Sequence, residues 1–187
     1  MQRLYAILFV VVGILFASSA ASAQMMRENP MVGGAAMYPT KTIVANAMNS
    51  ADHTTLVAAV KAAGLVDTLN SKGPFTVFAP TNAAFDQLPA GTVETLLKPE
   101  NKSMLSRVLT YHVVSGKYDA KALGKLIARG NGKARLKTVS GDTLTALMDG
   151  SNIVLRDARG GTSLVTQADV YQSNGVIHVV NAVLLPN

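Results

Sequence analysis

The side chains in this chain that are best suited to metal binding or catalysis are three histidines. His53, His112 and His178 lie far apart in the sequence, and neither H-x-H nor H-E-x-x-H spacing occurs. Cysteine is absent, which excludes a thiolate ligand and a thiol nucleophile. The eleven acidic residues are scattered along the chain. We therefore expect no catalytic residue, no metal site and no cofactor.

Each histidine also has a structural interpretation. From Gly175 to Leu185, apolar residues occupy both faces of a period-2 pattern, which predicts a buried central strand and a neutral, hydrogen-bonded His178. His112 stands where a helix passes into a strand, and a ring there can bind the last helix carbonyls. His53 belongs to a polar helix start, and we expect it to be solvated. His112 and His178 could share a metal if their strands met, but no third ligand accompanies them.

The segment Gly73–Pro89 shows a strand, a turn and a helix in succession, an arrangement that many active sites use. Its apolar alternation ends at Pro80, which cannot donate a ladder hydrogen bond. Thr81 is placed to cap the short helix that follows. Asp86 is the only acid near the turn, and the G-x-S-x-G, phosphate-loop and dinucleotide patterns are absent. We interpret the turn as structural and the protein as non-enzymatic.

The order of the predicted elements indicates the fold class. Apolar residues at helical spacing are concentrated in the first half of the chain, and strands with Gly and Asp turns follow. Helices are predicted over residues 42–48, 52–64, 82–88, 93–98, 103–110 and 119–130, and strands over 75–79, 111–116, 134–139, 143–148, 152–157, 163–170 and 174–185. Because the two kinds of element are segregated, we expect one α+β domain and not an alternating parallel sheet.

The N-terminus has the pattern of a secretory signal peptide. Arg3 precedes a short apolar run, and Ala21-Ser22-Ala23 ends it, so residues 1–23 are predicted to be removed by cleavage after Ala23. The apolar run is shorter than the roughly 20 residues that a membrane-spanning helix needs. We expect a secreted or periplasmic protein with no transmembrane segment in its mature chain.

Residues 24–40 are rich in Met, Gly and Pro, show no period, and are predicted to form an irregular arm before a domain of residues 41–187. Four thioethers lie in this arm: Met25, Met26, Met31 and Met37. Thioethers can bind Cu(I) in exported proteins, and they also pack adaptably against apolar surfaces. A copper-binding arm and an arm that docks on the domain both remain open.

The formal net charge of +6 is concentrated between residues 117 and 137. Lys117, Lys121, Lys125 and Arg129 recur every four residues, which places them near one side of a predicted helix. Such a patch favours an anionic partner, namely a glycan or a lipid headgroup, while predicted export argues against nucleic acid. A solvated helix face explains the same spacing, and the sequence leaves the oligomeric state open.

Three ordered segments resemble the fasciclin (FAS1) domain family. These are "GPFTVFAPTNAAFDQLP", "LTYHVVSGKY" and "NGVIHVVNAVLLP", which correspond to the first box, the Tyr-His motif and the second box of that family. The resemblance implies a wedge-shaped two-sheet β-sandwich with several helices packed around it. It also implies structural roles for Thr81, Asn82 and His178. Family domains act mainly in adhesion or interaction with proteins and cell surfaces, and single-domain secreted members occur in bacteria.

The same resemblance suggests where a partner and a ligand would bind. In animal members, integrin binding has been assigned to an Asp-Ile motif and to the Tyr-His region, which correspond here to Asp169-Val170 and Tyr111-His112. Val170 replaces Ile, and Ala168 stands where Pro is usual, so these residues carry over only as an exposed-patch hypothesis. Some algal relatives bind carotenoids in an apolar groove. A carrier of an apolar ligand, a carotenoid or a lipid, is therefore the first alternative to an interaction module.

Overall fold

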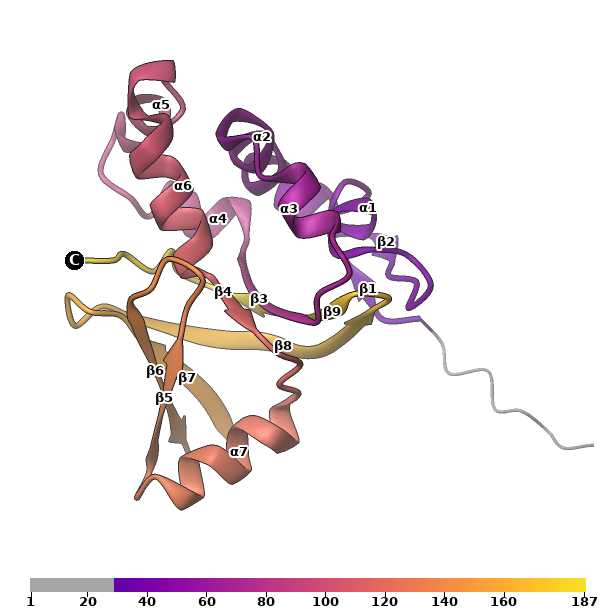
Figure 1. The fold of residues 1–187 in the computed structure, drawn as a ribbon, viewed down its shortest axis with the longest axis vertical. Helices are drawn as coiled ribbons and strands as arrows, with labels where there is room; N and C mark the ends of the chain where they lie inside the picture. The colour runs from indigo at the N-terminus through magenta and orange to yellow at the C-terminus, as the bar shows by residue number, and fades with distance from the viewer. Residues whose placement is uncertain (1–28) are drawn as a thin grey trace, which may run out of the picture.

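The computed structural model describes residues 29–187 (Figure 1), so the predicted signal peptide and its cleavage point lie outside the described residues. The helices are α1 (Ile43–Ala47), α2 (Thr54–Ala63), α3 (Val66–Asn70), α4 (Asn82–Asp86), α5 (Thr92–Leu96), α6 (Lys102–Tyr111) and α7 (Ala120–Arg129), with short 3-10 turns at Ala51–His53 and Pro99–Asn101. The strands are β1 (Met31–Val32), β2 (Ala35–Ala36), β3 (Phe75–Pro80), β4 (Val113–Ser115), β5 (Lys133–Lys137), β6 (Thr143–Asp149), β7 (Asn152–Arg156), β8 (Thr162–Gln172) and β9 (Gly175–Val180).

Seven strands form one bent sheet in the order β4-β3-β9-β8-β7-β6-β5. All neighbours are antiparallel except β3 and β9, which run parallel from Phe75 beside Gly175 to Pro80 beside Val180. The long β8 belongs to both halves of the sheet, because its first residues pair with β7 and those from Val165 to Gln172 pair with β9, with two register shifts between Val165 and Val170. The two halves stand at a steep angle to each other in Figure 1. The predicted α+β class is confirmed, and the two halves, joined through β8, correspond to the two sheets of the predicted FAS1 wedge.

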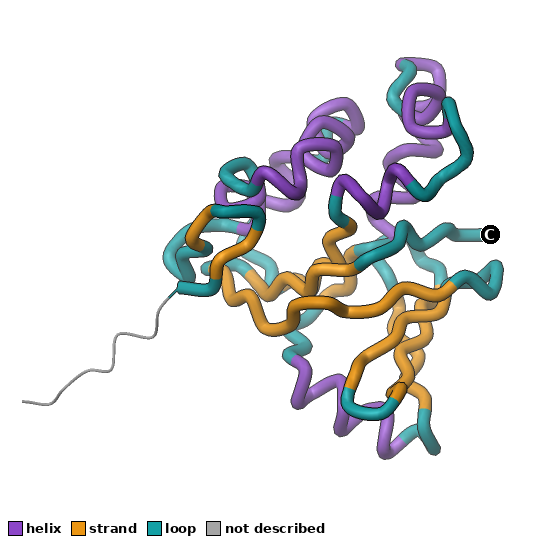
Figure 2. The backbone as a smooth tube through the Cα atoms, turned by 180° about the vertical axis from the view of Figure 1, so that it is seen from behind, coloured by secondary structure: helices purple, strands orange, loops and turns teal. Residues whose placement is uncertain are grey.

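Two apolar cores lie on opposite faces of the central pair β3 and β9. Val77 and Ile177 face the first core, which the helices α1 to α6 cover. Phe78 and Val180 face the second core, which lies inside the β5–β7 half and is closed by Leu123 of α7. Figure 2 shows the separation, with α7 alone at the end of the molecule opposite the other helices. Strands that are apolar on both faces therefore occupy the centre, as their sequences predict.

The segment before α1 is more ordered than the sequence predicts. Residues 31–36 form a small hairpin in which Met31 pairs with Ala36, and the Ala51 N–H donates to the Gly33 carbonyl at 3.0 Å. Val32 and Met37 are buried in the first core. The prediction of an irregular arm is therefore wrong for this hairpin. A two-residue strand is too short to show a period in the sequence.

The bent sheet almost closes on itself between its two end strands, β4 and β5. Val114 and Thr138 form an isolated antiparallel bridge, and the Val139 N–H donates to the Val113 carbonyl at 2.8 Å. No further pairing between β4 and β5 is recorded among the described residues. We call this partly closed junction the β4–β5 seam.

Candidate interaction site

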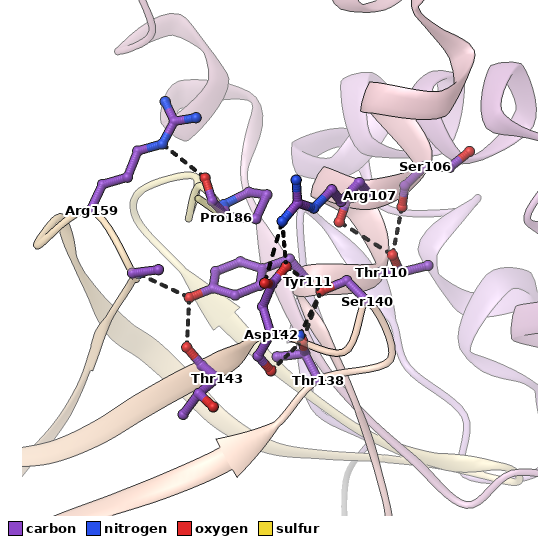
Figure 3. A network of polar contacts seen from close by, with 11 residues as sticks. Ser106, Arg107, Thr110, Tyr111, Thr138, Ser140, Asp142, Thr143, Arg159 and Pro186 are labelled. Atoms are coloured by element: carbon purple, nitrogen blue, oxygen red, sulfur yellow. Dashed lines mark hydrogen bonds and ion pairs between the residues drawn. The ribbon is translucent and has the colours of Figure 1, made fainter.

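Tyr111 joins the helical layer to the β6–β7 half of the sheet. Its side chain is fully buried at the end of α6. The phenol donates to the Thr143 carbonyl at 3.0 Å and accepts the N–H of Ala158 at 3.1 Å (Figure 3). Burial raises the pKa of Tyr111, so the hydroxyl keeps its proton and remains a donor. Because both partners are backbone groups, Tyr111 holds the end of α6 against β6 and the turn after β7.

A more exposed polar cluster surrounds Tyr111 in Figure 3. Arg107 of α6 forms an ion pair with Asp142 at 3.3 Å, and the Ser140 hydroxyl donates to the same carboxylate at 3.1 Å. The Arg107 side chain is 50% exposed, so this pair contributes no more than about 1 kcal/mol to stability. The cluster connects α6 to the turn before β6. Arg107, Ser140 and Asp142 each already bond to another member of the cluster.

His112 connects α6 to the C-terminal segment. Its Nδ1 donates to the Val108 carbonyl at 2.8 Å, and its Nε2 accepts the N–H of Leu184 at 3.0 Å. These two bonds require the neutral ring with its proton on Nδ1. Burial lowers the pKa of His112 to about 4, although the bond to the Val108 carbonyl opposes the shift. The ring therefore satisfies a helix carbonyl, as expected for its position at the helix end.

His178 and Asp169 together position the start of α7. The His178 Nε2 donates to the Tyr118 carbonyl at 2.8 Å, and burial lowers the pKa of this histidine. Asp169 adopts a positive φ of 61° in β8, and its Oδ1 accepts the N–H of Ala120 at 2.7 Å. Asp119 caps the same helix by accepting the N–H of Ala122 at 2.7 Å. Two carboxylates at a helix N-terminus also complement its dipole.

Thr81 and Asn82 hold the turn between β3 and α4. The Thr81 hydroxyl accepts the N–H of Ala84 at 3.3 Å, which is the N-cap that the sequence predicts. The Asn82 side chain accepts the N–H of Thr55 at 3.0 Å and donates to the Ala51 carbonyl at 2.9 Å. These bonds tie α4 to the start of α2. The polar side chains of this turn are therefore engaged in hydrogen bonds to the backbone.

The prediction that His53 is solvated is wrong. The N-terminal hairpin covers this region, and His53 is buried with only 3% of its surface exposed. Its Nδ1 lies 2.9 Å from the Ser50 hydroxyl, while its Nε2 has no hydrogen-bond partner among the described residues. Burial lowers the pKa of His53. A polar helix start could not reveal this burial, because the cover comes from a segment that the sequence predicts to be irregular.

The structure does not form the exposed patch that the resemblance suggested. Tyr111, His112 and Val170 are buried, and Asp169 is half-buried with its carboxylate bound to the start of α7. Asp169 and Val170 lie on β8, whereas Tyr111 and His112 lie at the end of α6. Direct contact of the three buried residues with a partner would require the domain to open.

The basic residues of α7 are accessible. Lys121, Lys125 and Arg129 are exposed on this helix, while Leu123 on its opposite side is buried in the second core. Lys117 is exposed just before the helix, and its Nζ lies 4.7 Å from the centre of the Tyr171 ring, a cation–π distance. The structure therefore brings Lys121, Lys125 and Arg129 onto one outer face, with Lys117 held separately at its beginning.

An apolar cleft lies between the first three helices and α6. Its lining includes Val44, Val60 and Leu69 from the helices and Phe75 from β3. Its cavity volume is about 50 Å³, far below the roughly 300–1,000 Å³ of small-molecule sites. A carotenoid or a lipid chain would fit only after these helices moved apart.

The side chains of residues 29–187 do not form a metal site. No three His, Cys, Asp or Glu side chains gather there in a way that could hold an ion. Met37 is buried in the first core, Met31 is 57% exposed, and Met25 and Met26 lie outside the described residues. Within residues 29–187, no helix combines the length and the apolar character that crossing a bilayer requires.

Comparisons with known proteins agree with this architecture. A family profile described as Fasciclin domain matches residues 51–186. Protein sll1483 of Synechocystis sp. is 44% identical over 89% of this chain and 85% of its own length. Cell surface glycolipoprotein MPB83 of Mycobacterium bovis is 34% identical over 88% of this chain and 70% of its length.

A solved structure shows the same fold. It is a FAS1 domain pair from the insect cell adhesion molecule fasciclin I, with a TM-score of 0.68 and 20% sequence identity. It covers 78% of this chain, which in turn spans 51% of that structure. From the profile match and the relatives that align over most of their length, together with the fold, we conclude that this chain belongs to the fasciclin (FAS1) domain family.

Proposed function

We propose that this protein is a non-enzymatic interaction module, exported after cleavage behind Ala23, that attaches to an anionic component of a protein or cell surface through α7. Two relatives support a surface role by their descriptions, one as a cell surface glycolipoprotein and one as a cell adhesion molecule. The polar side chains of the family motifs support the non-enzymatic part, since they are engaged with the backbone.

The observation that carries the proposal is the outer face of α7. Lys121, Lys125 and Arg129 are exposed there, and no salt bridge is recorded for them within residues 29–187. Asp119 and Asp169 fix the N-terminus of the helix, so the three charges are presented from a defined position. Exposed cations attract anionic surfaces and release them as salt rises.

A binding assay on cell-envelope fragments tests this proposal. We expect the protein to co-sediment with envelopes at low salt, and the combined variant Lys121→Glu, Lys125→Glu, Arg129→Glu to lose that binding. The matched control, Lys72→Glu, Lys98→Glu, Lys102→Glu, changes the net charge equally at exposed positions elsewhere. Equal loss in both variants would contradict a role for α7 and indicate a general charge effect.

The two alternatives receive less support. The small volume of the helical cleft argues against a carrier of an apolar ligand. Copper binding by the arm could not use Met37, because this side chain is buried in the first core. Native mass spectrometry with an absorption spectrum of the exported protein separates them from the proposal. A bound pigment or lipid would favour the carrier, and a copper adduct lost on deleting residues 24–39 would favour the metal site.

A further inference from the structure

The outer edge of β5 carries backbone groups that face the β4–β5 seam. In antiparallel strands, successive residues direct their N–H and C=O to opposite edges. The Thr138 N–H donates to the Asp142 carbonyl on the β6 side, while the Val139 N–H donates to Val113 across the seam. By this alternation the backbone groups of Lys137 and Arg135 face the seam. Lys137 lies opposite Thr143 of β6 and Arg135 lies opposite Thr145. In neither pair do the two residues hydrogen-bond to each other through the backbone.

The facing strand, β4, is short and ends at Ser115. The Gly116 N–H and the His112 carbonyl both bond to the β3 side of β4, which directs the groups of Ser115 to the seam. The Thr138 N–H bonds to the β6 side, so the antiparallel bridge between Val114 and Thr138 is held by the residues on either side, which join Val113 to Val139 and Ser115 to Lys137. Beyond this bridge, no pairing of β4 with β5 is recorded within residues 29–187. The seam is thus paired as far as Ser115 and Lys137, and the edge of β5 towards Arg135 has no partner strand among the described residues.

A groove lies along this unpaired edge. It is an open depression of about 550 Å³ with Tyr118, Leu126 and Leu136 among its apolar lining residues. Arg135 and Lys137 also line it. An added strand needs backbone partners on one edge and space for alternate side chains, and the groove supplies both.

The charges of β5 select the chemistry of an occupant. Lys133, Arg135 and Lys137 are all exposed, and no acidic residue lines the groove. A second copy of the same edge would place like charges opposite one another, which destabilises pairing between strands. An extended acidic segment would place opposite charges there. Lysine on an edge strand therefore suppresses self-association while admitting an acidic partner.

We propose that the edge of β5 at the β4–β5 seam is a docking site for an extended acidic peptide of a partner protein, which adds as a strand beside Arg135 and Lys137. The site rests on the proposed role as an interaction module, but it lies on β5 and not on α7. Its affinity comes from main-chain hydrogen bonds, and its selectivity comes from the three cations.

A labelled peptide of about ten residues that alternates Glu with Val, long enough to cover one strand, tests the site by fluorescence anisotropy and amide hydrogen exchange. We expect the protein to bind it and to protect the amides of residues 135 and 137 from exchange. The combined variant Lys133→Glu, Arg135→Glu, Lys137→Glu should weaken binding by about tenfold or more, because each substitution replaces an attraction to the acidic peptide with a repulsion. A peptide with Lys in place of Glu should not bind.

Two controls separate strand addition from general attraction. The α7 variant with Lys121, Lys125 and Arg129 changed to Glu has the same net charge as the β5 variant and should keep peptide binding within about twofold. Arg135→Pro removes one N–H that faces the seam and leaves the bonds to β6. In this variant the peptide should no longer protect the amide of residue 137 from exchange. Binding without protection at residues 135 and 137, or equal weakening by both charge variants, would overturn the proposal. Loss of envelope binding only in the α7 variant would leave the two surfaces independent.

Discussion

Acidification should destabilise the fold through His112. The neutral ring is required by its two bonds, because Nδ1 donates to Val108 and Nε2 accepts from Leu184. The folded pKa of about 4 lies below the ordinary value of 6.5, so the unfolded chain binds the proton more readily. The stabilisation is therefore fully present above pH 6.5 and is lost as the pH falls towards 4. At about 1.4 kcal/mol per pH unit, the loss at pH 4 is about 3 kcal/mol.

The variant His112→Gln isolates this contribution. A neutral amide cannot titrate, and it leaves at least one of the two backbone groups without its bond, which costs about 1–3 kcal/mol at pH 7.5. Urea unfolding from pH 7.5 to 4 should show the gap between the wild-type protein and the variant closing by about 3 kcal/mol, with the variant matching or exceeding the wild type at pH 4.

A control variant shows what the gap does when no titration is involved. Thr76→Val removes a buried hydroxyl that donates to the Gly116 carbonyl at 2.7 Å and accepts from Tyr118 at 2.8 Å. Its gap to the wild type should stay constant across the same pH range. A constant gap for His112→Gln as well would refute the reasoning, since the ring would then titrate alike in the folded and unfolded chains.

Three further predictions concern the supports of the two sheets and α7. Thr81→Ala should reduce the free energy of unfolding by about 1 kcal/mol because it removes an N-cap, and urea titration measures it. Tyr111→Phe leaves the Thr143 carbonyl and the Ala158 N–H without the phenol, so it should cost about 1–3 kcal/mol in the same assay, and no loss would mean that water replaces the hydroxyl. Asp169→Ala should destabilise the protein more than Asp169→Asn, because Asn keeps an acceptor and tolerates positive φ. Equal melting temperatures for these two variants would contradict the role of that carboxyl group.

The sequence predicts those parts of the fold whose pattern is local. The apolar faces of β9 and the cap at Thr81 follow from residues close together in the chain, and the structure shows a buried β9 and a capped α4. The predicted strand to Leu185 is too long, because β9 ends at Val180. Beyond that point the Asn181 side chain accepts the N–H of Leu164, an interaction that no repeat in the local sequence signals.

Features that depend on contacts between distant segments could not be predicted from the sequence. Apolar strands alone cannot tell that β3 and β9 run parallel, since that depends on which strands become neighbours. His53 is buried by a hairpin from another part of the chain, and the exposed-patch hypothesis failed because Tyr111 and His112 turn inward where α6 meets the sheet. The basic spacing of α7 is visible in the sequence, whereas the unpaired edge of β5 at Arg135 depends on where β4 stops pairing with β5, which only the structure shows.

The parallel pairing of β3 with β9 has a consequence for the order in which the chain can fold. Phe75 pairs with Ser115 on one side, but its partner on the other side is Gly175, near the end of the domain, and the two apolar cores lie on opposite faces of the β3–β9 pair. Contacts between residues so distant in sequence delay folding, because a large loop must close before they form. During synthesis from the N-terminus, the helices and the β5–β8 half must therefore wait without β9 until almost the last residue of the domain is made. Completion of this domain is therefore a late, nearly all-or-none event, and an early stop in synthesis leaves both cores open.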